Sequence, residues 1–254
     1  MQAIGLRVIA YVASKLAAAG LVFLGFLAIM AGFQLYEMSQ LAWELPLWKY
    51  IYGYAVLFSV VVDAVLYKYK AGPSKIALTV LLYILGGYVP FLFWFPGQWL
   101  LSLYAGVFGV ACALAFLAIS NLFRGLQLYS AAAALLLLAG SIYISTTDFT
   151  VTRQWTETRT ADSYQAEFAY FNGQKGIPVK LEKGQTLSYK IDWQITGGGY
   201  GTHLDAKGGT HTSAEQDVDA WFISYRVDTP STVRIVVTGD QAQGALKVSW
   251  EITD

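Results

Sequence analysis

Both histidines of the chain, His203 and His211, lie in one polar stretch, TGGGYGTHLDAKGGTHTSAEQDVDAW, at residues 196–221. Asp205, Asp217 and Asp219 lie in the same stretch, so imidazole nitrogens and carboxylate oxygens are close in sequence. Zinc binds three or four such ligands in a tetrahedral arrangement. These residue types therefore raise the hypothesis of a metal site, and the same side chains are also suited to recognising a ligand or a partner protein.

The spacing of these residues favours a simpler interpretation. It matches no compact helical or knuckle arrangement of zinc ligands, and it lacks the closely spaced oxygen ligands of an EF-hand calcium loop. Ordering a glycine-rich backbone would also oppose binding. The glycines around the histidines are Gly197, Gly198, Gly199, Gly201, Gly208 and Gly209. We therefore expect an exposed loop or hairpin extension without metal, and keep a metal site and a ligand- or partner-recognition loop as alternatives.

A second candidate is Asp63, a carboxylate within the apolar run YIYGYAVLFSVVVDAVLY. A charge at the bilayer centre costs about 2.5–3.5 kcal/mol on insertion scales, so such a residue is a functional candidate by default. Lys68 follows five residues later, and a helical rise of 1.5 Å places Asp63 about 7 Å below that interface. We expect a structural pair with Lys15 or contact with interfacial water, and the alternative is ion or proton coupling. Asn121 and Arg124 are interpreted as interface residues.

No other pattern indicates catalysis or a cofactor. The sequence has no G-x-S-x-G, H-E-x-x-H or P-loop motif, and GGGYG lies between predicted strands instead of before a helix. The single cysteine, Cys112, lies in an apolar run far from any histidine, so we expect a small packing residue. An enzyme built from the acidic residues and histidines near the C-terminus is the weakest alternative.

The chain that must position these residues is unusually apolar. Of its 254 residues, 56% are hydrophobic and 13% are charged, whereas ordinary soluble domains have about 25% charged residues. Its mean hydropathy is +0.46. Seven Lys or Arg stand against three Asp or Glu before Thr147, and ten against fourteen from Asp148 onward. Because the basic half is also the apolar half, we expect a lipid bilayer, and not nucleic acid, as its partner.

Five apolar runs are long enough to cross a bilayer, which takes about 20 residues as a helix. They are residues 16–35, 50–67, 76–95, 99–119 and 126–144. The first is too long for a signal-peptide core, and four more follow it, so we predict a true span. Six of the seven basic residues before Thr147 precede the first run or follow the second and fourth. This distribution predicts a cytoplasmic N-terminus and an extracellular C-terminal domain in the plasma membrane.

Small residues spaced four apart predict where these helices approach one another. Such residues allow close backbone contact, although they are also common in membrane helices without any packing role. The pattern comprises Ala28 and Gly32 in the first run, and Ala105, Gly109 and Ala113 in the fourth. Pro90 removes one backbone donor from the third run, so we expect a kink there.

From Asp148 onward, apolar residues recur at every second position instead of with the period of a helix. TLSYKIDWQI, ALKVSWEI and STVRIVVTG alternate apolar and polar residues, as half-buried strands do. Turn signals such as FNGQKG, EKGQ and DTPS separate six or seven strands. We predict an all-β, antiparallel β-sandwich or jelly-roll domain at residues 148–254, after a membrane α-helical bundle of five transmembrane helices at residues 1–147.

The last apolar run and the first strand are almost contiguous, so we expect the β domain to lie near the membrane. There it can rest on an apolar shelf formed by Leu41, Trp43, Leu45 and Leu47 between the first two spans. The lone cysteine and the lack of an N-x-[ST] acceptor favour a bacterial origin.

Together these patterns predict a non-enzymatic, multi-pass membrane protein. Its extracellular domain would bind a partner protein or ligand at the cell surface, as an accessory, sensor or immunity-type component. A transporter or channel-like subunit using Asp63 is one alternative. An envelope enzyme or metal-binding protein using His203 and His211 is another. The predicted fold class does not itself decide among them.

Overall fold

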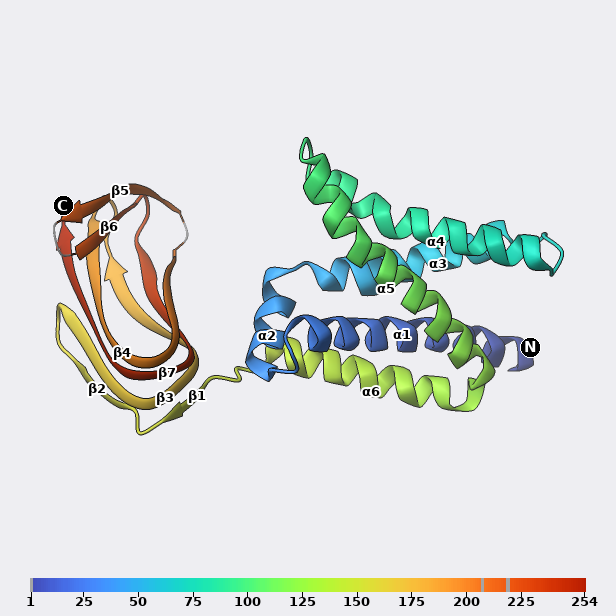
Figure 1. Ribbon diagram of the computed structural model, residues 1–254, viewed down its shortest axis with the longest axis horizontal. Coiled ribbons are helices and arrows are strands. Elements are labelled where there is room, and N and C mark those ends of the chain that lie inside the picture. The colour runs from blue at the N-terminus through green and yellow to red at the C-terminus, as the bar shows by residue number, and fades with distance from the viewer. Residues whose placement is uncertain (1, 207, 218–219) are drawn as a thin grey trace. The chain divides into compact units, whose positions relative to one another are not determined.

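The computed structural model describes the backbone of residues 2–206, 208–217 and 220–254, and the side chains of residues 8–126, 129–206, 208–210 and 223–254. The chain forms two compact units, Met1–Asp148 and Phe149–Asp254. The first unit is helical and the second is built of β-strands (Figure 1).

The helical unit contains six α-helices and a π-helical segment, η1, among its described residues. They are α1 (Gln2–Met30), α2 (Leu35–Glu44), η1 (Trp48–Ala55), α3 (Val56–Val65), α4 (Pro73–Trp94), α5 (Trp99–Gly125) and α6 (Gln127–Thr146). Five helical stretches are long and apolar enough to cross a membrane: Val8–Met30, Trp48–Val65, Pro73–Trp94, Trp99–Gly125 and Tyr129–Thr146. The prediction of five such helices is confirmed, although the first begins earlier than expected.

Helix α1 is the central helix of this unit. In its most apolar window 56% of the residues are buried, against 17–22% in the other four stretches. Its small residues allow a close approach to α6, because a methyl group at Gly20 would lie only 2.6 Å from the Cβ atom of Leu137. Ala13 and Ala17 pack against Ala134 on the same side. The packing of the small residues of VASKLAAAG against α6 was not predicted from the sequence.

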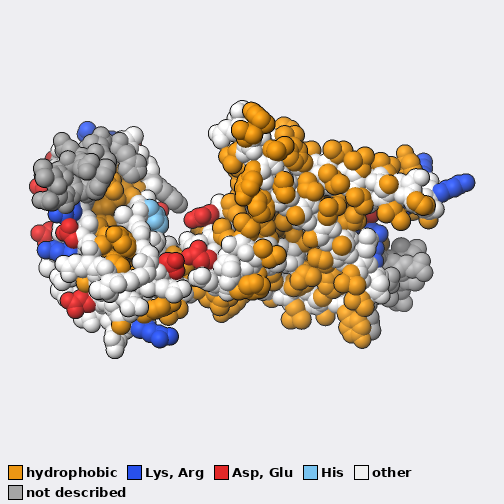
Figure 2. All heavy atoms as spheres, in the orientation of Figure 1, with side chains coloured by type: hydrophobic (Ala, Val, Ile, Leu, Met, Phe, Trp, Pro, Cys, Tyr) orange, Lys and Arg blue, Asp and Glu red, His pale blue; other side chains and the backbone are white. Residues whose placement is uncertain are grey.

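The face of the helical unit that Figure 2 shows is largely apolar. Phe93 on α4 is 81% exposed and Leu136 on α6 is 74% exposed. Large contiguous apolar surfaces are rare on soluble monomers and mark contact with a membrane or another protein. The surface is therefore compatible with insertion into a bilayer.

Two expectations about the segment after α1 are wrong. The connection forms helix α2, and successive residues of a helix turn by about 100°, so Leu41 and Trp43 do not share a face as the expected shelf requires. Gly32 lies beyond the end of α1 with a φ of +56°, and no described atom lies within 4 Å of a methyl group placed there. Gly32 therefore supplies a left-handed turn and does not pack against a helix as predicted with Ala28.

The β unit is one antiparallel sheet of seven strands among the described residues. They are β1 (Val151–Arg153), β2 (Thr156–Arg159), β3 (Ser163–Leu181), β4 (Thr186–Asp205), β5 (Gly209–Asp217), β6 (Ala220–Val227) and β7 (Ser231–Thr253). The spatial order is β1-β3-β7-β4-β6-β5, and β2 also pairs with β3. The all-β, antiparallel prediction is confirmed.

The three longest strands, β3, β4 and β7, bend sharply along their length (Figure 1). Their register shifts at the bend, between Phe168 and Gly173 on β3 and between Ile195 and Gly199 on β4. Gly198 has a φ of +84°, and any side chain there would collide with the backbone of Gln241. The bent sheet encloses a core in which Phe171 and other large side chains are fully buried. All seven described strands belong to one hydrogen-bonded sheet, so two separate sheets are not observed. The β-sandwich topology therefore stays a prediction.

Candidate functional site

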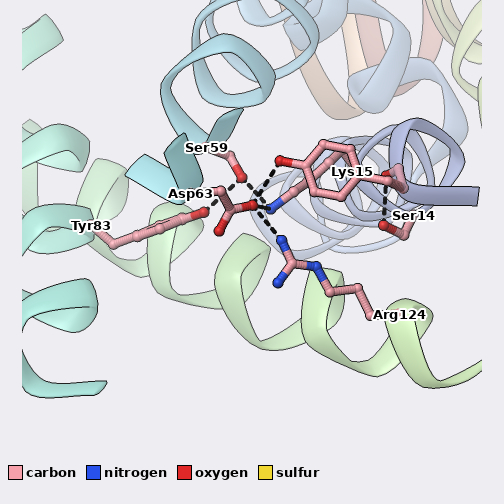
Figure 3. Close-up of polar contacts among 7 residues, drawn as sticks. Ser14, Lys15, Ser59, Asp63, Tyr83 and Arg124 are labelled. Carbon is pink, nitrogen blue, oxygen red and sulfur yellow. Dashed lines mark hydrogen bonds and ion pairs between the residues drawn. The ribbon is translucent and has the colours of Figure 1, made fainter. Parts of the chain in front are cut away.

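Asp63 is the centre of a polar cluster that joins α1, α3 and α5 (Figure 3). The Nζ atom of Lys15 lies 2.9 Å from its Oδ2 atom, which is the pair that the sequence suggested. The Tyr11 hydroxyl donates to the same oxygen at 2.7 Å. The Arg124 guanidinium also binds this oxygen. Arg124 is therefore part of the cluster and not only the interface residue that its position at a helix end had indicated.

Ser59 extends the cluster to α4. Lys15 Nζ donates to Ser59 Oγ at 2.5 Å, and the Tyr83 hydroxyl donates to the same oxygen at 2.8 Å. Lys15 is 2% exposed and Ser59 is fully buried. In apolar surroundings such hydrogen bonds are required, because a buried polar group without a partner is costly.

The cluster has two cations, Lys15 and Arg124, and one carboxylate. The side chains of Asp63 and Arg124 are 31% and 40% exposed, so the ion pairs lie at the edge of the helix packing. A buried cation is strongly destabilising when its counter-ion is removed. The geometry therefore supports a structural role that fixes three helices at one end of the unit.

Part of this cluster was missed in the sequence, although a signal exists. Tyr11 precedes Lys15 by four residues, and Ser59 precedes Asp63 by four, so each pair shares a helix face. The alternating direction of the helices brings the end of α5, with Arg124, to the same level. At the opposite end, Trp48 Nε1 donates to Ser145 Oγ at 3.1 Å.

A second feature of the helical unit is an apolar cavity of about 260 Å³ between α1, η1, α3, α4 and α5. Among the residues that the structure describes, no charged side chain lines it. Aromatic side chains form much of its wall: Phe26, Tyr50, Tyr54, Phe58, Tyr83, Phe91, Trp94, Phe95, Phe108 and Phe116. Cys112 also faces this cavity. It was expected to be a packing residue.

Small residues set the crossing of α4 and α5 beside the cavity. A methyl group at Gly87 would lie 2.7 Å from the carbonyl oxygen of Gly109 and 2.9 Å from the Cβ atom of Ala113. The structure thus places Gly109 and Ala113 against α4. Ala105, the third residue of that pattern, lines the cavity.

Pro90 lies inside α4, where it cannot donate to the carbonyl oxygen of Gly86. The Tyr54 hydroxyl, from η1, donates to that oxygen at 2.8 Å. One wall of the cavity is therefore held together by a side chain that replaces a missing backbone donor.

In the β unit, the described part of the polar stretch at 196–221 is mainly strand: its first part belongs to β4 and pairs with β7, and residues 209–217 form β5, which pairs with β6. His203 and Asp205 lie on β4, opposite Val236 and Arg234 of β7. Both are exposed, and Asp205 Oδ2 is 4.0 Å from Arg234 Nη1.

The side chains of His211 and Asp217, and the whole of Asp219, lie outside the described residues. Within the part of the chain that is described, no three His, Cys, Asp or Glu residues are placed to hold a metal ion.

Strand β4 has a partly open edge. It pairs with β6 only from Thr186 to Tyr189, whereas its pairing with β7 continues to Asp205. Among the described residues, β7 is thus the sole pairing partner of β4 beyond Tyr189. The open edge includes His203 and Asp205.

Glu157 on β2 has the most strongly shifted pKa among the described carboxylates of the β unit. Its Oε2 atom accepts hydrogen bonds from the Tyr164 hydroxyl at 2.6 Å and from Trp155 Nε1 at 2.8 Å, and Lys175 Nζ lies 2.9 Å away. These donors, Tyr164 first, lower the pKa of Glu157 to about 2. The group fastens β2 to β3 and was not predicted.

No protein-family model matches the chain, and a search of characterised proteins finds no relative.

Proposed function

We propose that the protein is a multi-pass plasma-membrane protein whose β unit lies outside the cytoplasm and recognises a partner protein without catalysis. The partner adds an extended strand to the open edge of β4. The observation that carries this proposal is the long stretch of β4 for which the described residues provide a pairing partner on one side only.

The composition of this edge supports strand addition. Natural proteins protect exposed strand edges with lysine, proline or other charges. Between Asp192 and Asp205, β4 contains no Lys, Arg, Glu or Pro, and Tyr200 is 57% exposed. An edge of this kind offers backbone hydrogen bonds to a partner, while exposed side chains such as His203 supply specificity.

The apolar surface of the helical unit supports membrane insertion, and the basic residues on alternate connections support an exported β unit. A transport role for Asp63 has less support. Three donors already bind its Oδ2 atom, and the cavity near the cluster is lined by apolar side chains.

The test uses the full chain in its own cells, with a photo-cross-linking amino acid at Tyr200. Thr232, which is exposed on β7 and pairs with Lys180 of β3, is the control because it lies outside the open edge of β4. We expect one defined protein adduct at position 200 and none at position 232. Equal adducts at both positions, or none at position 200, would contradict recognition through this edge.

A His203→Lys variant sharpens the test. A lysine on the open edge should weaken the adduct at position 200, because charged edge residues disfavour strand addition. Thr232→Lys should leave the adduct unchanged.

A further inference from the structure

We propose that the apolar cavity of the helical unit binds one acyl chain of a membrane phospholipid. The inference rests on the membrane insertion proposed above, but not on the role of β4. Its basis is the chemistry of the lining, the size and depth of the cavity, and the way in which η1 and α4 keep it open.

The lining excludes polar ligands. Two of its tyrosines have hydroxyls that point to other partners: Tyr54 donates to Gly86, and Tyr83 donates to Ser59. Sites for polar small molecules need a few convergent polar groups. Apolar cavities without such groups stay free of water and accept apolar molecules. The ligand class indicated is therefore a hydrocarbon chain.

The depth of the cavity corresponds to one leaflet of a bilayer. Its lining on α4 runs from Tyr83 to Trp94, which is about 16 Å at a rise of 1.5 Å per residue. Half of a hydrocarbon core of about 30 Å is about 15 Å. One end, near Trp94, lies toward the end of α4, and the other, at Tyr83, adjoins the Ser59 and Asp63 cluster. In the proposed orientation the chain enters from the outer leaflet.

The size of the cavity is sufficient for a single acyl chain. A volume of about 260 Å³ over that depth leaves a path about 4–5 Å across for the centres of carbon-sized atoms. One hydrocarbon chain can therefore lie along the cavity in single file.

The cavity is held open by rigid parts of the fold. The π-helical segment η1 contributes Tyr50 and Tyr54, and such segments occur frequently at functional sites. The Phe58 ring lies directly on Gly86, so that any side chain at Gly86 would displace it. Phe58 also contacts Tyr83 edge to face, with ring centroids 5.7 Å apart. These contacts keep the aromatic rings from collapsing into the cavity.

The experiment places the full chain in phosphatidylcholine nanodiscs that contain phosphatidylcholine with a photoactivatable diazirine in one acyl chain. After illumination, the modified residues are located by peptide mass spectrometry. We expect strong adducts on the cavity-facing residues Phe108, Cys112 and Phe116 of α5. The lipid-facing residue Val107, which is 64% exposed, should show the weaker labelling of freely exchanging lipid.

A filling variant and its control test the site directly. Ala105→Phe puts a ring into the cavity and should reduce the adducts at Cys112 about tenfold. Val107→Phe, on the lipid-facing side of the same helix, should leave them unchanged. If Ala105→Phe does not fold, the positions of the adducts on the wild-type chain still decide whether an acyl chain occupies the cavity.

Two outcomes overturn the inference in different ways. Adducts on lipid-facing residues alone would contradict the acyl-chain site but agree with membrane insertion. An absence of adducts on both faces would contradict insertion as well.

Discussion

The two units of the chain place their apolar and polar side chains in opposite ways. Among the described residues, every large apolar side chain that is exposed belongs to the helical unit, except Val151, Tyr200 and Ile252. In the β unit, Phe171 and Ile235 are completely buried. The buried polar side chains show the reverse distribution, because Lys15 and the buried serines of the described chain all lie in the helical unit.

This difference is compatible with a helical unit that lies in lipid and a β unit that lies in water. A β domain in water gains free energy by removing apolar side chains from water. Helices in lipid gain nothing from that exchange, so they associate through close packing of small residues and through hydrogen bonds between polar groups. Gly87 and Ser59 are examples of these two contacts in the helical unit.

The largest effect is expected from Asp63→Asn. It leaves the buried ammonium group of Lys15 without its counter-ion, which should destabilise the helical unit by about 3–5 kcal/mol. Thermal unfolding of the full chain in mild detergent measures the loss. Glu44→Gln, at an exposed carboxylate on α2, is the control and should change little. Equal midpoints for the two variants would show that the cluster does not stabilise the bundle.

A lysine on the apolar surface tests whether the helical unit lies in lipid while the β unit lies in water. Leu136 lies within the span Tyr129–Thr146, so Leu136→Lys should reduce membrane insertion by about 2.5–3.5 kcal/mol. Val151→Lys, also at an exposed apolar residue but in the β unit, should change stability by less than about 0.5 kcal/mol. The fraction of each variant that resists extraction from membranes by alkali is the measurement. If similar fractions of both variants resisted extraction, the proposed difference in solvent between the two units would be contradicted.

Close helix packing predicts a smaller effect. Gly87→Ala forces α4 away from Gly109, and such overpacking should destabilise the helical unit by about 1–3 kcal/mol. Gly25→Ala in α1 is matched to it, since no described atom from outside its own stretch of helix lies within 4 Å of the new methyl group. That change should be neutral or stabilising by up to about 1 kcal/mol. Unfolding midpoints in detergent distinguish them, and a neutral Gly87→Ala would argue against tight packing.

The smallest effect concerns Glu157 in the β unit. Its pKa falls from about 4.3 in the unfolded chain to about 2 in the folded chain. Its stabilising contribution is therefore complete above pH 4.3 and is lost as the pH falls toward 2. Because the side chain is 44% exposed, the contribution should stay below about 1 kcal/mol.

Urea unfolding of the full chain, followed by the circular dichroism of the sheet, measures this dependence. Glu157→Gln should flatten it in the acidic range. An unchanged slope in the variant would assign the acid sensitivity to other carboxylates.

Sequence patterns were sufficient for features that repeat along the chain. Apolar runs of bilayer length identified the five long helices, and alternation in TLSYKIDWQI identified a strand of the β unit. A pattern of charges at one membrane level suggested the contact between Lys15 and Asp63. These inferences need only the spacing of apolar residues within one element, or the level of a charged residue along its own membrane span.

Features that depend on contacts between elements were missed. Glycines in TGGGYG resemble a loop, yet β7 provides the matching bulges that allow β4 to continue through the bend. Pro90 predicted a missing donor, but the hydroxyl of Tyr54 that replaces it comes from a different helix. The cavity likewise arises from five segments, so no local pattern indicates it.

The most direct test of the contrast between a lipid-embedded unit and an exported unit is cysteine labelling of whole cells. In a Cys112→Ala background, one variant has Lys183→Cys on the turn between β3 and β4, and another has Lys70→Cys on the turn between α3 and α4. A membrane-impermeant maleimide should label position 183 in intact cells and position 70 only after permeabilisation. Labelling at position 70 but not at position 183 in intact cells would contradict the account.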